Sequence, residues 1–444
     1  MKPRQSKPRL VQAVLDAFRM PDLRRRILLT FAMLVAFRFI AHVPLPGVDP
    51  VALKSIFQSN ALLGMLDMFS GGALKNFSVA AMGVYPYITA TIIIQLMQPV
   101  IPALQRLSME GEAGRDKVNR ISHLLTIPLA ALSGYGEIML LHNMNPAAIY
   151  PGVAIPPLAM ITMIMSLIAG TVFLVWLGEL ITEYGIGNGI SILIFAGIVA
   201  GYPTMFGDLG LAWDSNKIGV SLFALILLAS IVFIVLFTEA HRRISVQYAR
   251  TSFRGGRMYR QTGGTHIPLR VNTAGMIPLI FSMSLVVFPG MIASYFMNPA
   301  GTDPNIANAI YKIFSPNTSL PLGIIYWALY FLLTIAASFF YTMVIFQQQD
   351  LPGTLQRQGG FIPGIRPGKN TESFLNNVIN RITLAGSLFL GIVAVIPFIA
   401  KFTTNIQTVQ LSSTGLIIVI GVVLDTMKQM EAQLTMRRYE GFIK

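Results

Sequence analysis

The chain contains ten stretches of predominantly apolar residues, each long enough for one helix to cross the hydrocarbon core of a bilayer. They lie at about 27–45, 77–98, 121–141, 156–178, 187–206, 218–238, 272–295, 321–346, 379–400 and 411–427. A backbone that crosses lipid has to satisfy its own hydrogen bonds, and isolated segments of this length do so as helices. The chain is 54% hydrophobic and 12% charged, about half the charged share of a soluble domain. We therefore predict an all-α integral membrane protein with ten transmembrane helices.

The basic residues lie mainly on one side of these predicted spans. Because the number of spans is even, both termini fall on the same side. Of the 33 Lys and Arg residues, 27 fall on that side when Arg381, at the start of the ninth span, is counted with it; five fall on the other side, and Arg38 lies within the first span. Basic residues are enriched in the short cytoplasmic segments of membrane proteins. The asymmetry therefore predicts that both termini are cytoplasmic.

The N-terminal segment is basic and amphipathic. Leu10, Val14 and Phe18 recur at helical spacing among basic residues, and Pro21 ends the pattern. Such a segment is typical of a helix that lies in the cytoplasmic membrane interface. The alternative is the n-region of a cleaved signal peptide.

The second span is interrupted. Gly71 and Gly72 break the apolar stretch between 60 and 102, and Gly83 and Pro86 weaken the helical pattern that follows. An interior Gly costs a helix about 1 kcal/mol and a Pro about 3 kcal/mol. We expect a short helix over 60–69, a Gly-Gly turn and a helix over 77–98. Broken backbone at membrane depth is tolerated inside protein or along a cavity; an outer loop before an ordinary span is the alternative.

Chemically reactive side chains are scarce within the spans. The ionisable residues near span ends are Arg38, Glu137, Glu179, Glu183, Glu239 and Asp425. Ion-coupled carriers usually carry such residues at mid-membrane. The sequence also contains no cysteine, no HExxH motif and no complete P-loop. We expect no enzymatic activity, no cofactor and no metal; a secondary transporter and an intramembrane enzyme are the rival classes.

The pattern G-x-x-P-x-I occurs twice, at 83–88 and 275–280. The two copies lie in the second and seventh spans, which are the second members of two sets of five and which cross in opposite directions. Two inverted five-helix halves related by an axis in the membrane plane would produce this arrangement. Broken helices at the interface of such halves line a central site.

Two cytoplasmic connections, at about 239–271 and 347–373, are unusually long. The first contains seven arginines, a possible short strand at 243–249, and expected turns at 255–256 and 263–264; the second places Arg366 among prolines and glycines. Attraction to anionic lipids is one explanation of this charge. Docking to a polyanion such as ribosomal RNA, or to an acidic protein, is the other. The candidate docking residues are Arg242, Arg243, Arg254, Arg257, Arg260 and Arg366.

Several segments resemble the SecY family, the channel subunits of the bacterial Sec protein translocase. They are GVYPYITATIIIQL at 83–96, ITEYGIGNGISILIFAGIVAG at 181–201, GGFIPGIRPGKNT at 359–371 and the Tyr439-Glu440-Gly441 tail. The resemblance implies a channel in the inner (cytoplasmic) membrane that moves unfolded secretory polypeptides and releases transmembrane segments sideways into lipid. It also implies an hourglass pore between the two halves. The implied partners are SecE-like and SecG-like subunits, the SecA ATPase, the ribosome, signal peptides and nascent chains.

The resemblance further implies residues for three sites. A hydrophobic constriction maps onto Ile88, Ile92, Ile190, Ile194, Ile280 and Ile418. A plug helix that closes the outer funnel maps onto about 60–72, with Leu62, Leu63, Met65, Leu66, Met68 and Phe69. Arg366 matches the loop arginine that engages the motor or the ribosome.

These features divide the chain into consecutive parts. We expect a cytoplasmic N-terminal segment (1–26), a first half with spans one to five (27–206), an outer hinge loop (207–217), a second half with spans six to ten (218–427) and a cytoplasmic tail (428–444).

Overall fold

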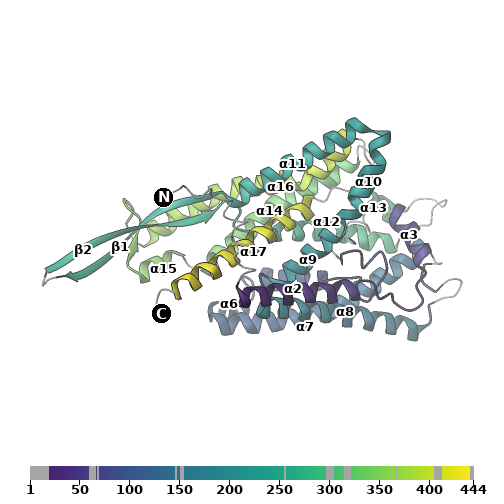
Figure 1. The fold of residues 1–444 in the computed structure, drawn as a ribbon, viewed down its shortest axis with the longest axis horizontal. Helices are drawn as coiled ribbons and strands as arrows, with labels where there is room; N and C mark the ends of the chain where they lie inside the picture. Colours follow the sequence, from purple (N-terminus) through teal and green to yellow (C-terminus); the bar gives the residue numbers. More distant parts are fainter. Residues whose placement is uncertain are drawn as a thin grey trace.

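The computed structural model describes residues 20–59, 67, 70–145, 148–150, 155–254, 257–296, 305–314, 322–349, 351–366, 368–404 and 413–440. The fold is mostly helical (Figure 1). The helices are α2 (Pro21–Ile40), α3 (Pro50–Ser59), α5 (Tyr85–Met97), α6 (Pro102–Met109), α7 (Glu112–Met144), α8 (Pro157–Tyr184), α9 (Gly189–Ala200), α10 (Tyr202–Ser215), α11 (Lys217–Glu239), α12 (Ile277–Tyr295), α13 (Ile306–Ile313), α14 (Leu322–Gln349), α15 (Leu351–Arg357), α16 (Lys369–Thr404) and α17 (Ser413–Glu440). The strands are β1 (His241–Arg254), β2 (Arg257–Arg270) and β3 (Gly360–Phe361). The basic, amphipathic segment before Met20 lies outside the described residues.

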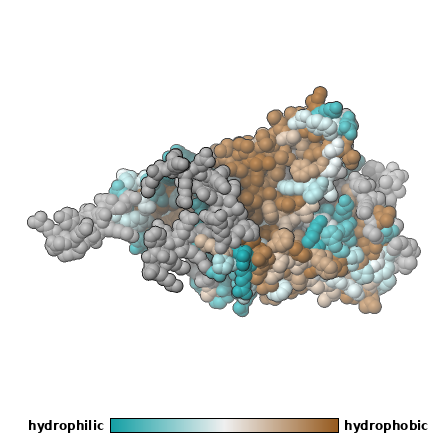
Figure 2. All heavy atoms as spheres, viewed as in Figure 1, coloured by the Kyte–Doolittle hydropathy of each residue, from teal (hydrophilic) through white to brown (hydrophobic). Residues whose placement is uncertain are grey.

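A helix overlaps each of the ten predicted apolar stretches. By length and composition, six helices of the described chain can cross a membrane, or seven if α5 and α6, bent by 104°, form one span. Large apolar side chains of α11 face outward; Leu225 is 64% exposed. Figure 2 shows apolar surface over the middle of the helical bundle, as expected where lipid tails replace water. The prediction of a mostly helical membrane protein is confirmed.

The helix expected over 77–98 begins only at Tyr85. Residues 71–84 form successive turns, in which Phe77 and Gly83 adopt positive φ angles of 42° and 55°. Pro86 sits in the first turn of α5, where its missing N–H costs no helical hydrogen bond. The turns pair with the end of the first span instead, because the amide of Val79 donates to the carbonyl of Val43 at 3.0 Å. We call residues 70–84 the stem.

Three other boundaries differ from the sequence prediction. The expected outer loop at 207–217 is helical through Ser215, as α10. Helix α16 begins at Lys369, inside the expected second cytoplasmic loop, and α17 continues through the expected tail to Glu440. The extension of α17 carries helix formers such as Lys428, Gln429 and Met430, so that helix continues past the hydrophobic stretch that defines a span.

Buried apolar residues form two main clusters and a third between them. One cluster joins α11, α12, α14, α16 and α17, with Phe223, Tyr326 and Leu390 at its centre. A second joins α3, the stem, α7 and α8 around Phe77 and Leu167. The third draws residues from α2, the stem, α8 and α9 together with Ile280 of α12 and Ile418 of α17. Elements from both ends of the chain therefore share this third cluster.

The two long loops that were expected to be cytoplasmic share one sheet, so the fold departs from the all-α prediction. Strands β1 and β2 pair antiparallel over their whole length, and the hairpin projects from the end of the bundle opposite α3 and α13 (Figure 1). Strand β3 of the second loop pairs with β1 through Gln247↔Phe361 and Tyr248↔Gly360. The expected turn at 263–264 is wrong because Gly263 lies opposite Tyr248 within the ladder. The expected strand exists but is twice as long as 243–249.

The stem lies too close to α8 for any side chain at Gly170. A Cβ atom added at Gly170 would lie 1.9 Å from the carbonyl oxygen of Val79. Gly170→Ala should therefore lower the unfolding temperature of the purified protein, because overpacking costs about 1–3 kcal/mol. Gly210→Ala on α10 is the matched control, since nothing lies within 4 Å of its added Cβ. Equal unfolding temperatures for the two variants would contradict this packing.

Candidate functional site

Helices α5 and α12 begin in the same way. Gly83 and Gly275 have positive φ angles of 55° and 66°, and each lies two residues before the first helical residue. Pro86 and Pro278 each occupy the second position of their helix. The repeated G-x-x-P-x-I pattern is therefore a repeated helix start, and it places Ile88 and Ile280 at the same point of their helices.

These two helix starts face each other across a narrow apolar cavity. Ile88 and Ile280 line it together with Ile194 of α9 and Val84 of the stem. The volume of this cavity is only about 20 Å³, which leaves room for little more than one water molecule. Tyr85 and Ser284 also line this cavity. Branched aliphatic side chains thus close the region where the helix starts meet.

Five of the six isoleucines predicted for the constriction belong to one cluster. Ile418, Ile194 and Ile280 are 0%, 4% and 6% exposed, and Ile88 and Ile190 are partly buried against them. The five come from α5, α9, α12 and α17, which are distant in sequence. We call these residues, together with Val84, the isoleucine ring.

Ile92 does not join the ring. It lines a separate cavity with Ile277 and Phe281 of α12 and Tyr341 of α14. The ring surrounds the beginning of α5, and Ile92 lies one turn, about 6 Å, further along that helix. Val84, 4% exposed, belongs to this cluster although the sequence analysis did not name it. The internal repeat could have identified it, because Val84 corresponds to Met276, which packs against the same cluster.

The GIGNGIS segment positions Ile190 and Ile194. Asn188 caps α9 by accepting a hydrogen bond from the amide of Ser191 at 3.1 Å, and Gly187 has a φ angle of 80°. The amide of Gly189 donates to Thr182 Oγ1 at 2.8 Å, which ties the start of α9 to the end of α8. A Cβ atom at Gly189 would lie 1.8 Å from the carbonyl oxygen of Gly178. The glycines therefore allow α9 to turn back closely against α8 with its isoleucines directed toward the ring.

All six side chains named for the plug lie outside the described residues. The structure describes Asp67 and the turn that follows. The carboxylate of Asp67 accepts a hydrogen bond from the amide of Lys75 at 2.7 Å, and its carbonyl accepts one from Gly72 at 3.0 Å. Gly71 and Gly72 have φ angles of 70° and 84°, which confirms the expected Gly-Gly turn. This turn is shared by the end of the predicted plug segment and the beginning of the stem.

The candidate docking arginines belong to the shared sheet and its loop. Arg242 and Arg243 are exposed at the base of β1. The backbone register places Arg254 opposite Arg257, and Arg260 opposite Thr251, at the far end of the hairpin. The side chains of these last three arginines lie outside the described part.

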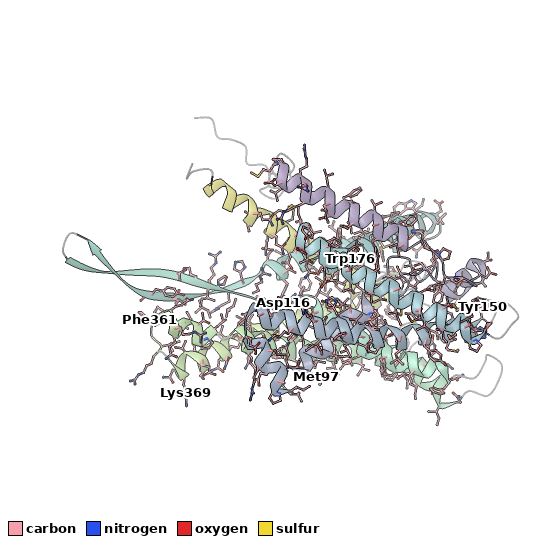
Figure 3. All side chains as sticks on the ribbon, turned by 90° about the horizontal axis from the view of Figure 1, so that it is seen from below. Met97, Asp116, Tyr150, Trp176, Phe361 and Lys369 are labelled. Atoms are coloured by element: carbon pink, nitrogen blue, oxygen red, sulfur yellow. The ribbon has the colours of Figure 1, made fainter. Side chains whose placement is uncertain are left out.

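Arg366 is exposed on a well-anchored loop. Its carbonyl accepts a hydrogen bond from Thr371 Oγ1 at 3.1 Å. Ile362 is buried nearby in a cluster with Val246 of β1. Figure 3 labels Phe361 and Lys369, which flank this loop at the hairpin end of the molecule. The structure thus presents Arg366 on the same folded unit as Arg242 and Arg243.

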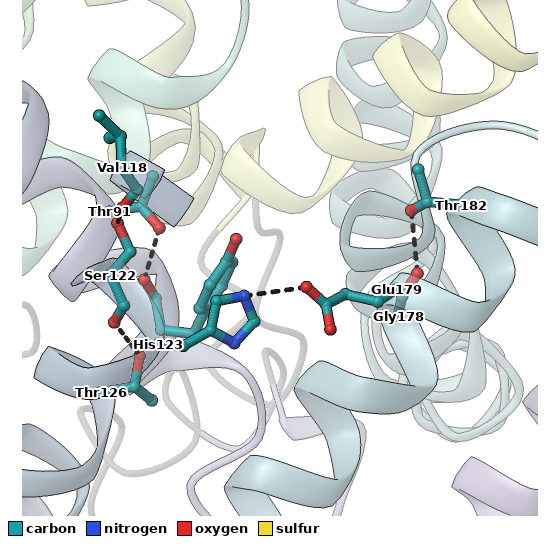
Figure 4. A network of polar contacts seen from close by, with 9 residues as sticks. Thr91, Val118, Ser122, His123, Thr126, Gly178, Glu179 and Thr182 are labelled. Atoms are coloured by element: carbon teal, nitrogen blue, oxygen red, sulfur yellow. Dashed lines mark hydrogen bonds and ion pairs between the residues drawn. The ribbon is translucent and has the colours of Figure 1, made fainter. Parts of the chain in front are cut away.

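A polar network ties α7 to α8 (Figure 4). The Nε2 atom of His123 lies 2.9 Å from a carboxylate oxygen of Glu179, and the ring of Tyr87 on α5 lies 5.2 Å from the imidazole. Among the described residues, no group of three His, Asp or Glu side chains could hold a metal ion. The network therefore contributes contacts between helices, with no metal cluster in the part of the chain that the structure describes.

The chain is similar to known proteins over nearly its whole length. The sequence model of the SecY family matches residues 78–427. Protein translocase subunit SecY of Halalkalibacterium halodurans is 42% identical, with 98% of this chain and 100% of that protein covered. The same subunit of Thermotoga maritima is 40% identical, with 98% of each chain covered.

Solved structures share the fold at low identity. A protein-conducting channel has a TM-score of 0.61 at 15% identity, covering 94% of this chain and 96% of that chain. A SecY protein whose plug domain stabilises the closed state of the translocation channel has a TM-score of 0.65 with the same coverage. Sec61 from the canine ribosome–channel complex of the endoplasmic reticulum has a TM-score of 0.60. With a family match over most of its residues and full-length relatives above 30% identity, this chain belongs to the SecY family.

Proposed function

We propose that the chain forms a protein-conducting channel of the cytoplasmic membrane and that unfolded secretory polypeptides pass through the isoleucine ring. The observation that carries this proposal is the ring itself, where two repeated helix starts meet α9 and α17. Family membership and the shared fold of solved channels support it. Its relatives carry the name protein translocase subunit.

The chemistry of the ring suits a passage for polypeptides. A translocating chain presents side chains of every kind, so the neck has to fit around it without specific contacts. Branched aliphatic groups offer no hydrogen bonds, and a narrow apolar neck disfavours water and ions. The small cavity beside Ile280 is consistent with a closed and dry neck. The ring therefore acts as a flexible gasket.

Ten crossings in two inverted halves account for the packing. All residues of the first cluster lie between Tyr202 and Ile420, and all residues of the second lie between Leu45 and Ile168. Each half therefore has a core of its own. The matching starts of α5 and α12 occupy the corresponding position in each of two such halves. Helix α10 is then the hinge between halves, and the division of the chain at about 207–217 stands as part of this proposal.

Lateral release needs a seam between the halves. The cavity that contains Ile92 lies between α5 of the first half and α12 and α14 of the second. Its walls are almost wholly apolar, so separating them exposes a surface suited to lipid tails or a hydrophobic segment. We assign this seam as the exit for transmembrane segments and as the contact for signal peptides.

Energy and docking come from partners in this proposal. We assign the shared sheet and Arg366 to a motor such as the SecA ATPase or to the ribosome, whose RNA is a polyanion. SecE-like and SecG-like subunits would surround the apolar outer face, and anionic lipids would contact the basic cytoplasmic residues. The chain itself needs no catalytic centre and no cofactor for this role. The similarity of this fold to Sec61 from a ribosome–channel complex supports the assignment of the docking surface.

The first prediction concerns Arg366. The side chain of Arg366 is exposed and its loop is anchored. A charge reversal there should therefore alter the surface charge and leave the fold intact. Arg366→Glu should lower motor-driven export at least tenfold in vesicles while membrane levels and association with a SecE-like subunit stay normal. Arg357→Glu, in the neighbouring helix α15, is the matched charge control. Normal export kinetics in Arg366→Glu would remove this residue from the docking surface.

The second prediction concerns the plug. Deleting residues 60–72 should give a channel that assembles but leaks ions and accepts precursors with defective signal sequences. Planar-bilayer conductance and export assays measure the two effects. A deletion protein that fails to accumulate at any temperature would identify the segment as a packed structural element.

The third prediction concerns the ring. Ile280→Asn, Ile418→Asn and Val84→Asn each place an amide in a dry neck, and an unpaired buried amide costs roughly 1–3 kcal/mol. The open, hydrated state loses little, so resting conductance and export of signal-defective precursors should rise about tenfold. The control is Ile138→Asn, which changes a fully buried isoleucine of the second cluster and should only destabilise. Loss of function without any gain in all three ring variants would rule out the gasket.

A further inference from the structure

Arg38 in the last turn of α2 reaches across to the Gly71-Gly72 turn at the end of the predicted plug. Its Nη1 atom donates a hydrogen bond to the carbonyl oxygen of Gly71, 33 residues away in the sequence. The backbone at Gly71 is held closely on two other sides. A Cβ atom there would lie 2.8 Å from Gly197 Cα on α9 and 3.3 Å from the ring of Phe37. The turn is therefore enclosed by α2, α9 and one guanidinium group.

This contact lies directly beyond the isoleucine ring. Gly197 follows Ile194 by three residues, which corresponds to about 4.5 Å along α9. Phe37 and Ile198 belong to the same buried cluster as Ile194 and Ile418. The carbonyl that Arg38 holds is thus fixed against the helix that carries two members of the ring.

Arginine suits a fixed hydrogen bond at this depth. The guanidinium group has five N–H donors and no acceptor, and it stays charged. Its bond to a carbonyl is charge-assisted and about twice as strong as a neutral one. A charged donor near the end of an apolar span is costly unless it has such an acceptor. Moving Gly71 away therefore leaves Arg38 without the partner that the closed arrangement supplies.

We propose that Arg38 is a positioning residue that latches the plug turn at Gly71 against α9 and so sets how readily the channel opens. This inference rests on the channel function proposed above. When the channel opens, the Arg38–Gly71 hydrogen bond breaks and the Gly71–Gly197 contact separates. The latch acts on the turn at Gly71, whereas the isoleucine ring acts on the neck itself.

The charge of Arg38 offers a competing role, as an electrostatic filter at the outer side of the neck. The two roles differ in their dependence on the plug. A filter acts on ions whenever the pore is open, with or without the plug. A latch has nothing to hold once residues 60–72, including Gly71, are deleted.

The test uses the complete translocase in planar bilayers, with Arg38→Gln measured in the intact channel and in the channel that lacks 60–72. We expect resting conductance and export of signal-defective precursors to rise about tenfold in the intact channel, as for loss of one charge-assisted hydrogen bond. In the deleted channel, Arg38→Gln should change neither the conductance nor the ratio of cation to anion permeability. Arg38→Lys keeps the charge but has a shorter reach. Its conductance should return less than halfway from the Arg38→Gln value to the wild-type value.

Two results would overturn the latch. One is an unchanged conductance in intact Arg38→Gln; the other is an equal change of conductance or ion selectivity in the deleted channel, which would identify a filter. Gly71→Ala gives an independent check if Arg38→Gln accumulates poorly, because its Cβ displaces the same turn without altering charge. It should leak like Arg38→Gln, and a tight Gly71→Ala channel also contradicts the latch. If Ile418→Asn leaks in the same bilayers while both latch variants stay tight, the channel function holds and only this inference fails.

Discussion

Backbone hydrogen bonding at the start of α5 is the constraint on which the rest of the structure depends. A helix that begins inside a membrane protein leaves its first four N–H groups without helical partners. Pro86 removes one of these donors, and the amide of Tyr85 donates to the carbonyl of Met82 in the stem at 3.3 Å. The stem is itself held by the bond from Val79 to the carbonyl of Val43. That solution is available only where protein covers the stem on every side. The stem is accordingly enclosed by α2, α7 and α8, and it reaches the centre of the bundle.

The neck follows from this enclosed break. Helices α5 and α12 both follow a glycine with positive φ and carry a proline in the first turn, so each helix begins inside the bundle. Their first turns can therefore approach each other directly. The gap between them is filled by Val84, Ile88 and Ile280, and α9 and α17 add Ile194 and Ile418. A continuous pair of spans would pack along its length and leave no short constriction. The same break also supplies the turn at Gly71 that Arg38 holds.

Much of this arrangement could be predicted from the sequence. The apolar stretches located the helices, and the repeated G-x-x-P-x-I pattern identified the two helix starts that meet. The resemblance supplied the six isoleucines, of which five lie in one cluster with Val84, whereas Ile92 lines a separate cavity. The residue at which α5 begins could not be read from the sequence, because that start depends on tertiary contacts of the stem. The pairing of β3 with β1 joins residues more than 100 apart, and no local pattern encodes such a contact.

The most direct test of the account is a cross-link between the ring and a polypeptide in transit. The chain contains no cysteine, so a single introduced cysteine is the only thiol it carries. A secretory precursor with one cysteine, arrested midway, should form a disulfide with Ile418→Cys and with Val84→Cys. It should form none with Ile138→Cys, a fully buried position of the second cluster. Adducts at Ile138→Cys, or none at the two ring positions in an actively exporting translocase, would contradict the passage of polypeptide through the isoleucine ring.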